Sequence, residues 1–105
     1  MSRTVRIEVT AEDIAKGRRW ECTLCPVSRA IARVLDCRPQ VGPDSVTLFC
    51  NARRFEDVRL PESAQRFIQD FDARVGRPAP FAFDLDDVPD TIPDRPSTPA
   101  PAVRP

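Results

Sequence analysis

The 105-residue chain contains no histidine and no tyrosine, and its three glycines stand far apart. Without an imidazole it cannot form a Ser-His-Asp triad, a Cys-His nucleophile pair or a histidine metal site. The isolated Gly17, Gly42 and Gly76 exclude a phosphate-binding loop and a dinucleotide fingerprint, which need clustered glycines. Catalysis would have to rest on thiols, carboxylates or arginines, so we expect a protein that is not an enzyme.

Long apolar runs are also missing. The first twenty residues contain no stretch like the apolar core of a signal peptide, and no segment approaches membrane-spanning length. We therefore expect a cytoplasmic protein without a membrane partner. In that compartment, the four cysteines are expected to be free or metal-bound rather than joined in disulfides.

The charges balance to zero over the whole chain but are unevenly placed. Residues 1–80 carry 14 basic and 11 acidic side chains, whereas residues 81–105 carry two arginines and five aspartates. A body with a net charge of only +3 is less basic than most dedicated nucleic-acid binders. The composition therefore argues against nucleic acid as the main partner.

The C-terminal segment 88–105 holds six of the twelve prolines and only three large apolar side chains, Val88, Ile92 and Val103. Such a segment buries too little apolar surface to offset the entropy lost on ordering its backbone. We therefore predict a compact domain over residues 1–87 and a disordered, proline-rich, acidic tail over residues 88–105.

The N-terminal half shows three local patterns. Residues 3–9 alternate between apolar and polar side chains, which is typical of a half-buried strand. Thr10 and Asp13 form a capping-box pattern for one short helical turn, which Gly17 is expected to end in a left-handed conformation. Pro26 suits the first position of a longer helix, whose apolar face recurs with helical spacing until Pro39.

The C-terminal half is predicted to contain strands near 46–50, 57–60 and 81–85 and a helix over 61–75. Phe67, Ile68 and Phe71 lie on one face of that helix and are expected in the core. The order of elements is β-α-α-β-β-α-β. It predicts a small single α+β domain of three to four mostly antiparallel strands, with two main helices packed on one face of a sheet.

The four cysteines include one close pair, Cys22 and Cys25, which directly precedes the predicted helix. A zinc site made by Cys22, Cys25, Cys37 and Cys50 is an alternative, but such sites usually have a second close pair. Redox chemistry is another, because a helix N-terminus lowers the pKa of a thiol such as Cys25, with Cys22 as the resolving partner. Cys37 and Cys50 are more simply small core residues, so no cofactor is expected and zinc stays a minor alternative.

Arginines also surround the only tryptophan. Arg18, Arg19 and Trp20 could grip phosphate and stack on a base, and Arg53 and Arg54 could extend that surface. The competing interpretation is a buried tryptophan with solvated loop arginines. Nucleic-acid binding is therefore the second function considered.

Several short motifs resemble a type of small, functionally uncharacterised protein found in bacteriophages and actinobacterial genomes. The similarity covers most of residues 3–85 and lies in these segments: Ile7–Pro26 with Asp13-Ile14, Gly17 and Cys22-x2-Cys25-Pro26; Arg59-Leu60-Pro61; Ala64; Arg66-Phe67-Ile68; Phe71-Asp72; and Pro80–Phe83. The resemblance implies a phage or mobile-element accessory gene and no particular activity.

The leading hypothesis is a small, non-enzymatic accessory protein that acts by binding, with another protein as the partner. A nucleic-acid-binding module using the arginines and Trp20 is one alternative. A thiol redox or zinc-binding protein centred on Cys22 and Cys25 is the other. The sequence leaves the oligomeric state open.

Overall fold

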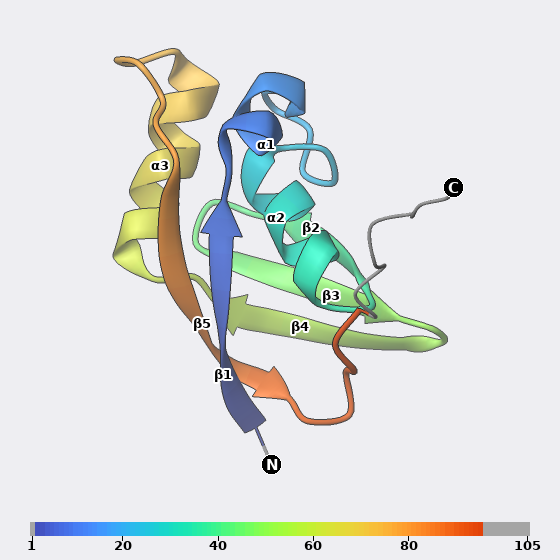
Figure 1. The fold of residues 1–105 in the computed structure, drawn as a ribbon. Coiled ribbons are helices and arrows are strands. Elements are labelled where there is room, and N and C mark those ends of the chain that lie inside the picture. Colours follow the sequence, from blue (N-terminus) through green and yellow to red (C-terminus); the bar gives the residue numbers. More distant parts are fainter. Residues whose placement is uncertain (1, 96–105) are drawn as a thin grey trace, which may run out of the picture.

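The computed structural model describes residues 2–95, and all of its strand pairs are antiparallel. The strands are β1 (Ser2–Val9), β2 (Arg38–Val41), β3 (Ser45–Cys50), β4 (Arg53–Arg59) and β5 (Phe81–Pro89), and the helices are α1 (Ala11–Lys16), α2 (Pro26–Val34) and α3 (Glu62–Ala73). Figure 1 shows this arrangement. The predicted α+β class is confirmed, together with its two main helices.

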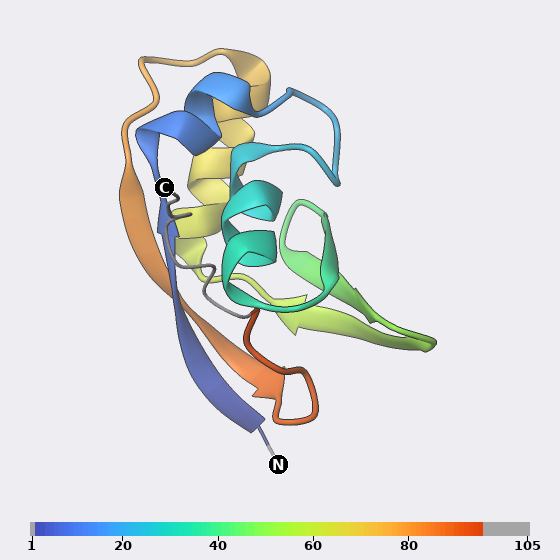
Figure 2. The ribbon, with the colours of Figure 1, turned by 45° about the vertical axis from the view of Figure 1, so that its right-hand side comes forward.

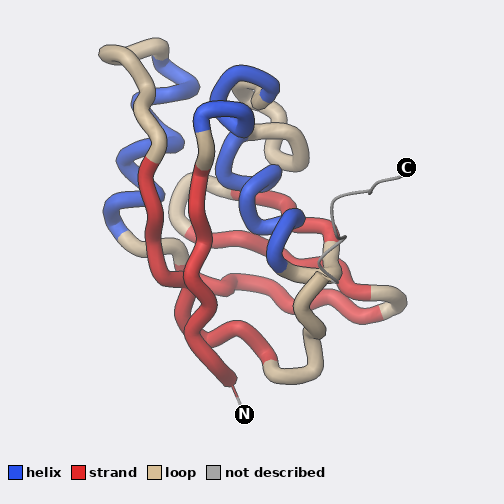
Figure 3. The backbone as a smooth tube through the Cα atoms, viewed as in Figure 1, coloured by secondary structure: helices blue, strands red, loops and turns tan. Residues whose placement is uncertain are grey.

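The strands form two sheets rather than the single sheet of three to four strands that we predicted. β1 pairs with β5, and β2, β3 and β4 form a separate three-stranded sheet. The two sheets run in clearly different directions (Figures 1 and 2). α2 packs against strands of both sheets, β1 and β2, and the helices gather at one end of the molecule (Figure 3).

The extra strand β2 was missed because it is short and contains Pro39, which the sequence analysis took only as the end of a helix. Pro39 lies opposite Leu48 of β3. A proline is tolerated there because β2 is an edge strand and loses no essential ladder bond. β4 is also longer than predicted, because it begins at Arg53 rather than near residue 57.

The local signals around α1 are partly confirmed. The Thr10 hydroxyl accepts a hydrogen bond from the Asp13 amide (3.1 Å), and the Asp13 carboxylate accepts one from the Thr10 amide (2.9 Å), which completes the capping box. The prediction of a left-handed Gly17 is wrong, because its φ is −71°. The close approach of Pro26 explains why residue 17 is glycine, because a Cβ there would lie 2.6 Å from the Pro26 ring.

The domain continues past the boundary predicted at residue 87. Val88 and Ile92 are fully buried in the core, and Leu35 forms an isolated bridge with Asp94. We call residues 90–95 the C-terminal strap. Residues 96–105, the rest of the predicted tail, lie outside the described residues.

The strap is held by hydrogen bonds to the end of α2 and to β1. The Arg95 amide donates to the Val34 carbonyl (2.8 Å), and the Asp36 amide donates to the Pro93 carbonyl (2.9 Å). Arg3 donates to the Ile92 carbonyl at 2.8 Å. The strap therefore satisfies a carbonyl at the end of α2 that no helical partner reaches, while Ile92 fills the core.

Candidate functional site: a cleft beside the CxxC loop

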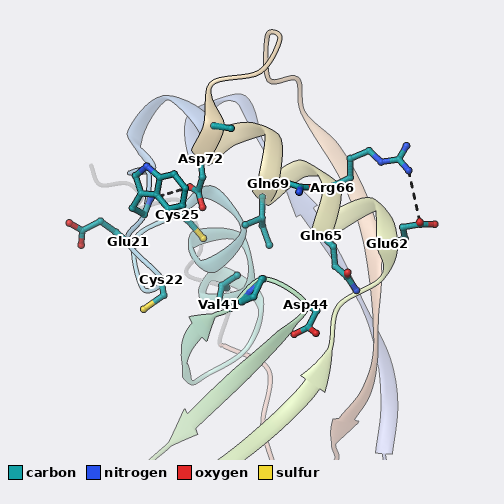
Figure 4. Close-up of a pocket in the computed structure, with 15 residues that line it drawn as sticks. Glu21, Cys22, Cys25, Val41, Asp44, Glu62, Gln65, Arg66, Gln69 and Asp72 are labelled. Atoms are coloured by element: carbon teal, nitrogen blue, oxygen red, sulfur yellow. Dashed lines mark hydrogen bonds and ion pairs between the residues drawn. The ribbon is translucent and has the colours of Figure 1, made fainter.

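A cleft of about 740 Å³ opens between the α1–α2 loop, the β2–β3 turn and one face of α3 (Figure 4). Its lining residues are Trp20, Glu21, Cys22, Cys25, Val41, Gly42, Pro43, Asp44, Glu62, Gln65, Arg66, Ile68, Gln69, Asp72 and Ala73. Among the residues that sequence analysis proposed, only Trp20, Cys22 and Cys25 line this cleft.

The α1–α2 loop is fixed by backbone hydrogen bonds. The Arg18 amide donates to the Leu24 carbonyl (2.9 Å), and the Leu24 amide donates to the Glu21 carbonyl (3.0 Å). The Val41 amide donates to the Cys22 carbonyl (2.8 Å), which docks the loop on the outer edge of β2. One wall of the cleft is thus a well-bonded turn attached to a sheet edge.

Trp20 stands at the rim with 78% of its surface exposed, so the prediction of a buried tryptophan is wrong. Its φ of 63° places the backbone in the left-handed region, which is uncommon for a bulky side chain. The Trp20 amide donates to the Asp72 carboxylate of α3 at 3.1 Å. The loop therefore holds its largest apolar side chain in solvent, in a conformation that costs free energy.

Arg19 attaches the same loop to the C-terminal end of α3. Its Nε donates to the Phe71 carbonyl at 2.9 Å, and its guanidinium carbon lies 4.8 Å from the centroid of the Phe71 ring. The Phe71 carbonyl also accepts from the Arg74 amide (3.2 Å), so Arg19 is a second donor to this carbonyl in the last turn of α3, where a basic side chain is favoured. Arg19 therefore attaches the loop to α3, and a nucleic acid that bound its guanidinium would have to displace the Phe71 carbonyl.

The cleft is acidic, with an apolar floor. Its lining contains four carboxylates, those of Glu21, Asp44, Glu62 and Asp72, and a single guanidinium, Arg66. Arg66 lies 3.9 Å from Glu62, which neutralises it in part. Val41 and Ile68 are buried core residues that also line the cleft, and they add apolar surface at its base.

The two thiols of the CxxC differ in environment. Cys25 is the buried N-cap of α2, and its Sγ accepts a hydrogen bond from the Ser28 amide at 3.4 Å. Burial raises the pKa of Cys25 and outweighs the opposing hydrogen bonds from Ser28 and Val27, so the lowered pKa predicted from the helix N-terminus is wrong. Cys22 is exposed, and its thiol points away from that of Cys25 (Figure 4). This geometry does not favour a redox dithiol.

The structure separates the four cysteines into two pairs. Cys37 and Cys50 are buried at the end of the β2–β3 ladder that lies opposite its turn, and neither lines the cleft, as Cys22 and Cys25 do. Within residues 2–95, no three cysteine, aspartate or glutamate side chains gather as metal ligands. The four-cysteine zinc site is therefore not assembled in the described part of the chain.

The second basic group lies elsewhere. Arg53 and Arg54 begin β4 at the β3–β4 hairpin, which projects away from the α1–α2 loop in Figures 1 and 2. Arg53 stacks over the Phe55 ring at 5.0 Å, and Arg54 forms a 2.6 Å ion pair with Glu56. The two arginine groups therefore do not form one continuous basic surface.

Sequence reasoning missed the carboxylates of the cleft because they come from three separate segments of the chain. Glu21 belongs to the α1–α2 loop, Asp44 to the β2–β3 turn, and Glu62 and Asp72 to opposite ends of α3. No spacing motif connects them, so only the folded arrangement reveals their common sign of charge.

Comparison of the chain with protein-family models, with curated proteins and with solved structures gives no match. No helix among residues 2–95 is long and apolar enough to cross a membrane. The functional argument therefore rests on the cleft and its surroundings.

Proposed function

We propose that this protein is a non-enzymatic binding protein whose cleft receives a segment of a protein partner that carries basic and apolar side chains. The observation that carries the proposal is Trp20, held in solvent at the rim of an acidic cleft. An accessory role of the phage type fits such a protein and stays a prediction.

The conformation of Trp20 supports binding. A left-handed backbone costs a non-glycine residue on the order of 1–2 kcal/mol, and strain of this kind concentrates at functional sites. Tryptophan is also enriched among the residues that dominate binding energy, because its large ring becomes desolvated in a partner's pocket. An exposed Leu24 in the same loop adds further apolar surface.

The charge of the cleft supports a basic partner segment. Lysine or arginine side chains entering the cleft would approach Glu21 and Asp44, while the phosphates of a nucleic acid would meet the same carboxylates and be repelled. The apolar floor would receive an aliphatic or aromatic side chain next to those basic groups. A short amphipathic peptide of positive charge is thus the occupant that this surface fits.

The proposal is tested by selecting binders to the full chain from a displayed library of random linear peptides. Selected peptides are then titrated against the protein while the fluorescence of Trp20 is recorded. Trp20 is the only tryptophan and the chain has no tyrosine, so the emission comes almost entirely from the cleft rim. We expect a consensus of basic residues beside an apolar one, with a blue shift on binding.

Two variants make the test specific. Trp20→Ala, whose affinity is measured by titration calorimetry because the variant lacks the fluorescent side chain, should bind the selected peptides at least tenfold more weakly, since burial of a tryptophan anchor contributes about 2 kcal/mol or more. Arg53→Ala at the β3–β4 hairpin is the matched control and should leave the affinity unchanged. An acidic consensus, or equal loss in both variants, would contradict the proposal. Salt-sensitive binding of a single-stranded oligonucleotide that is lost in Arg53→Ala would favour the nucleic-acid alternative instead.

A further inference from the structure

The buried thiols Cys37 and Cys50, which are distant in sequence, lie opposite each other across two strands. The β2–β3 ladder is regular from Val41 opposite Val46 to Arg38 opposite Phe49. One further step in the same register places Cys37 opposite Cys50. The Sγ of Cys50 confirms this proximity, because it donates to the carbonyl of Asp36 at 3.6 Å.

The hydrogen-bond pattern shows which kind of cross-strand pair this is. At the hairpin turn, the Gly42 amide donates to the Ser45 carbonyl at 2.8 Å, so these residues form a hydrogen-bonded pair. Hydrogen-bonded and non-hydrogen-bonded pairs alternate along an antiparallel ladder. The pairs beginning at Val41, Pro39 and Cys37 are consequently of the non-hydrogen-bonded kind.

Three backbone groups agree with this assignment. The Val41 amide turns outward to the Cys22 carbonyl, Pro39 has no amide proton to give, and the Cys37 amide donates to the Leu35 carbonyl. Non-hydrogen-bonded pairs bring their side chains closest, with Cα atoms about 4.5 Å apart. A disulfide spans Cα separations of about 4.4–6.8 Å, so the backbone needs little movement to join these two thiols.

We propose that Cys37 and Cys50 are a modification site that closes to a cross-strand disulfide when the protein meets a peroxide. The site is independent of the cleft and of the function proposed for it. One thiolate attacks a peroxide oxygen and becomes a sulfenic acid, with release of water. The second thiolate attacks that sulfur, forms the S–S bond and releases a second water. The two thiols lose two electrons and two protons, and hydrogen peroxide becomes two water molecules.

We expect the disulfide to form slowly, because both thiols are buried and the strap covers the backbone around Cys37. Burial, together with a smaller effect of the neighbouring Cys50, raises the pKa of Cys37 to about 11, so little attacking thiolate is present in the closed fold. The Arg95 guanidinium donates to the Cys37 carbonyl at 3.2 Å, and Pro93 accepts from the Asp36 amide. A small oxidant such as hydrogen peroxide therefore suits the site better than a bulky disulfide.

The chain offers a direct test, because trypsin places each cysteine pair in its own peptide. Cleavage after arginine yields residues 20–29 with Cys22 and Cys25, and residues 34–53 with Cys37 and Cys50, since Arg38 precedes a proline and is not cut. Full-length protein is exposed to hydrogen peroxide, denatured, alkylated and digested. We expect peptide 34–53 to lose the mass of two hydrogens and take up no alkyl group.

The same oxidation should raise the thermal midpoint of unfolding on the order of 10 °C, because the bond closes a loop in the unfolded chain. Cys50→Ser should show neither the mass change nor the shift, whereas a Cys22→Ser, Cys25→Ser double variant should show both. A peptide 34–53 that still accepts two alkyl groups, carries only sulfinic acids or is linked to peptide 20–29 would overturn the proposal.

Discussion

At the scale of single residues, Asp13 carries the only buried charge among residues 2–95. Its two oxygens accept hydrogen bonds from both terminal nitrogens of Arg33 at 2.7 and 2.6 Å, while Arg29 lies 3.7 Å away. Asp13 is fully buried, whereas the sequence pattern indicated only its part in a capping box. One side chain thus caps α1 and attaches it to α2.

Neutralising Asp13 should therefore destabilise the domain. Asp13→Asn leaves the arginines without their partner charge, and we expect the free energy of unfolding to fall by about 2–3 kcal/mol. Urea unfolding measures this change. Glu12→Gln is the matched control: Glu12 forms only an exposed pair with Lys16, so a change as large as that in Asp13→Asn would contradict the assigned role.

The same carboxylate predicts a dependence on pH. Burial acts to raise the pKa of Asp13, but the hydrogen bonds from Arg33 and Thr10 outweigh it and hold the pKa below its ordinary value of 3.8. A group with a lowered pKa in the folded state stabilises the fold above its unfolded pKa, and this contribution is lost as the pH falls through the folded pKa. Unfolding free energies measured between about pH 5 and about pH 2 should therefore fall less steeply in Asp13→Asn than in the natural protein.

At the scale of elements, Gly17 determines how closely α1 approaches α2. A Cβ there would meet the Pro26 ring at 2.6 Å and the Asp13 carbonyl at 2.7 Å. Gly17→Ala must push α2 away from α1, and we expect a loss of about 2 kcal/mol in unfolding free energy. Gly76→Ala is a useful comparison, since no atom lies near its Cβ and only its φ of 69° opposes the change, which should cost about 1 kcal/mol. Equal losses would contradict a steric role for Gly17.

The elements also show what the sequence could predict. β1, α2 and α3 each have one buried and one exposed face, so their periodicity revealed them. β2 has only four residues and contains a proline, and its pairing depends on a turn at Pro43 and Asp44 that carries no apolar signal. The cleft could not be predicted from the sequence, because its carboxylates belong to segments that come together only in the folded chain. The sequence left Trp20 either as a contact residue or as a core residue, and the fold settles only that its side chain is exposed.

At the scale of the whole molecule, the strap connects the last strand, β5, to the C-terminal end of α2. Ile92 is its only buried side chain, and Ile92→Ala should lower the unfolding free energy by about 3 kcal/mol through the cavity that it leaves. Val103→Ala is the control in the predicted tail and should leave the stability unchanged. A loss in Val103→Ala comparable to that in Ile92→Ala would show that the tail prediction for residues 96–105 is wrong.

The strap also links stability to thiol chemistry. The strap contacts the backbone of Leu35, Asp36 and Cys37, so we expect opening of residues 90–95 to give peroxide access to Cys37 and Cys50. Local opening of this kind becomes more frequent when the buried anchor is removed. We therefore expect Ile92→Ala to oxidise at Cys37 and Cys50 at least tenfold faster than the natural protein, measured as the rate at which peptide 34–53 ceases to accept alkyl groups. Gly76→Ala, which changes the loop between α3 and β5, distinguishes local from global opening. Its oxidation rate should stay unchanged if the strap opens locally, whereas a rise of about fivefold, as its loss of about 1 kcal/mol predicts, would mean that the thiols react only when the whole domain unfolds.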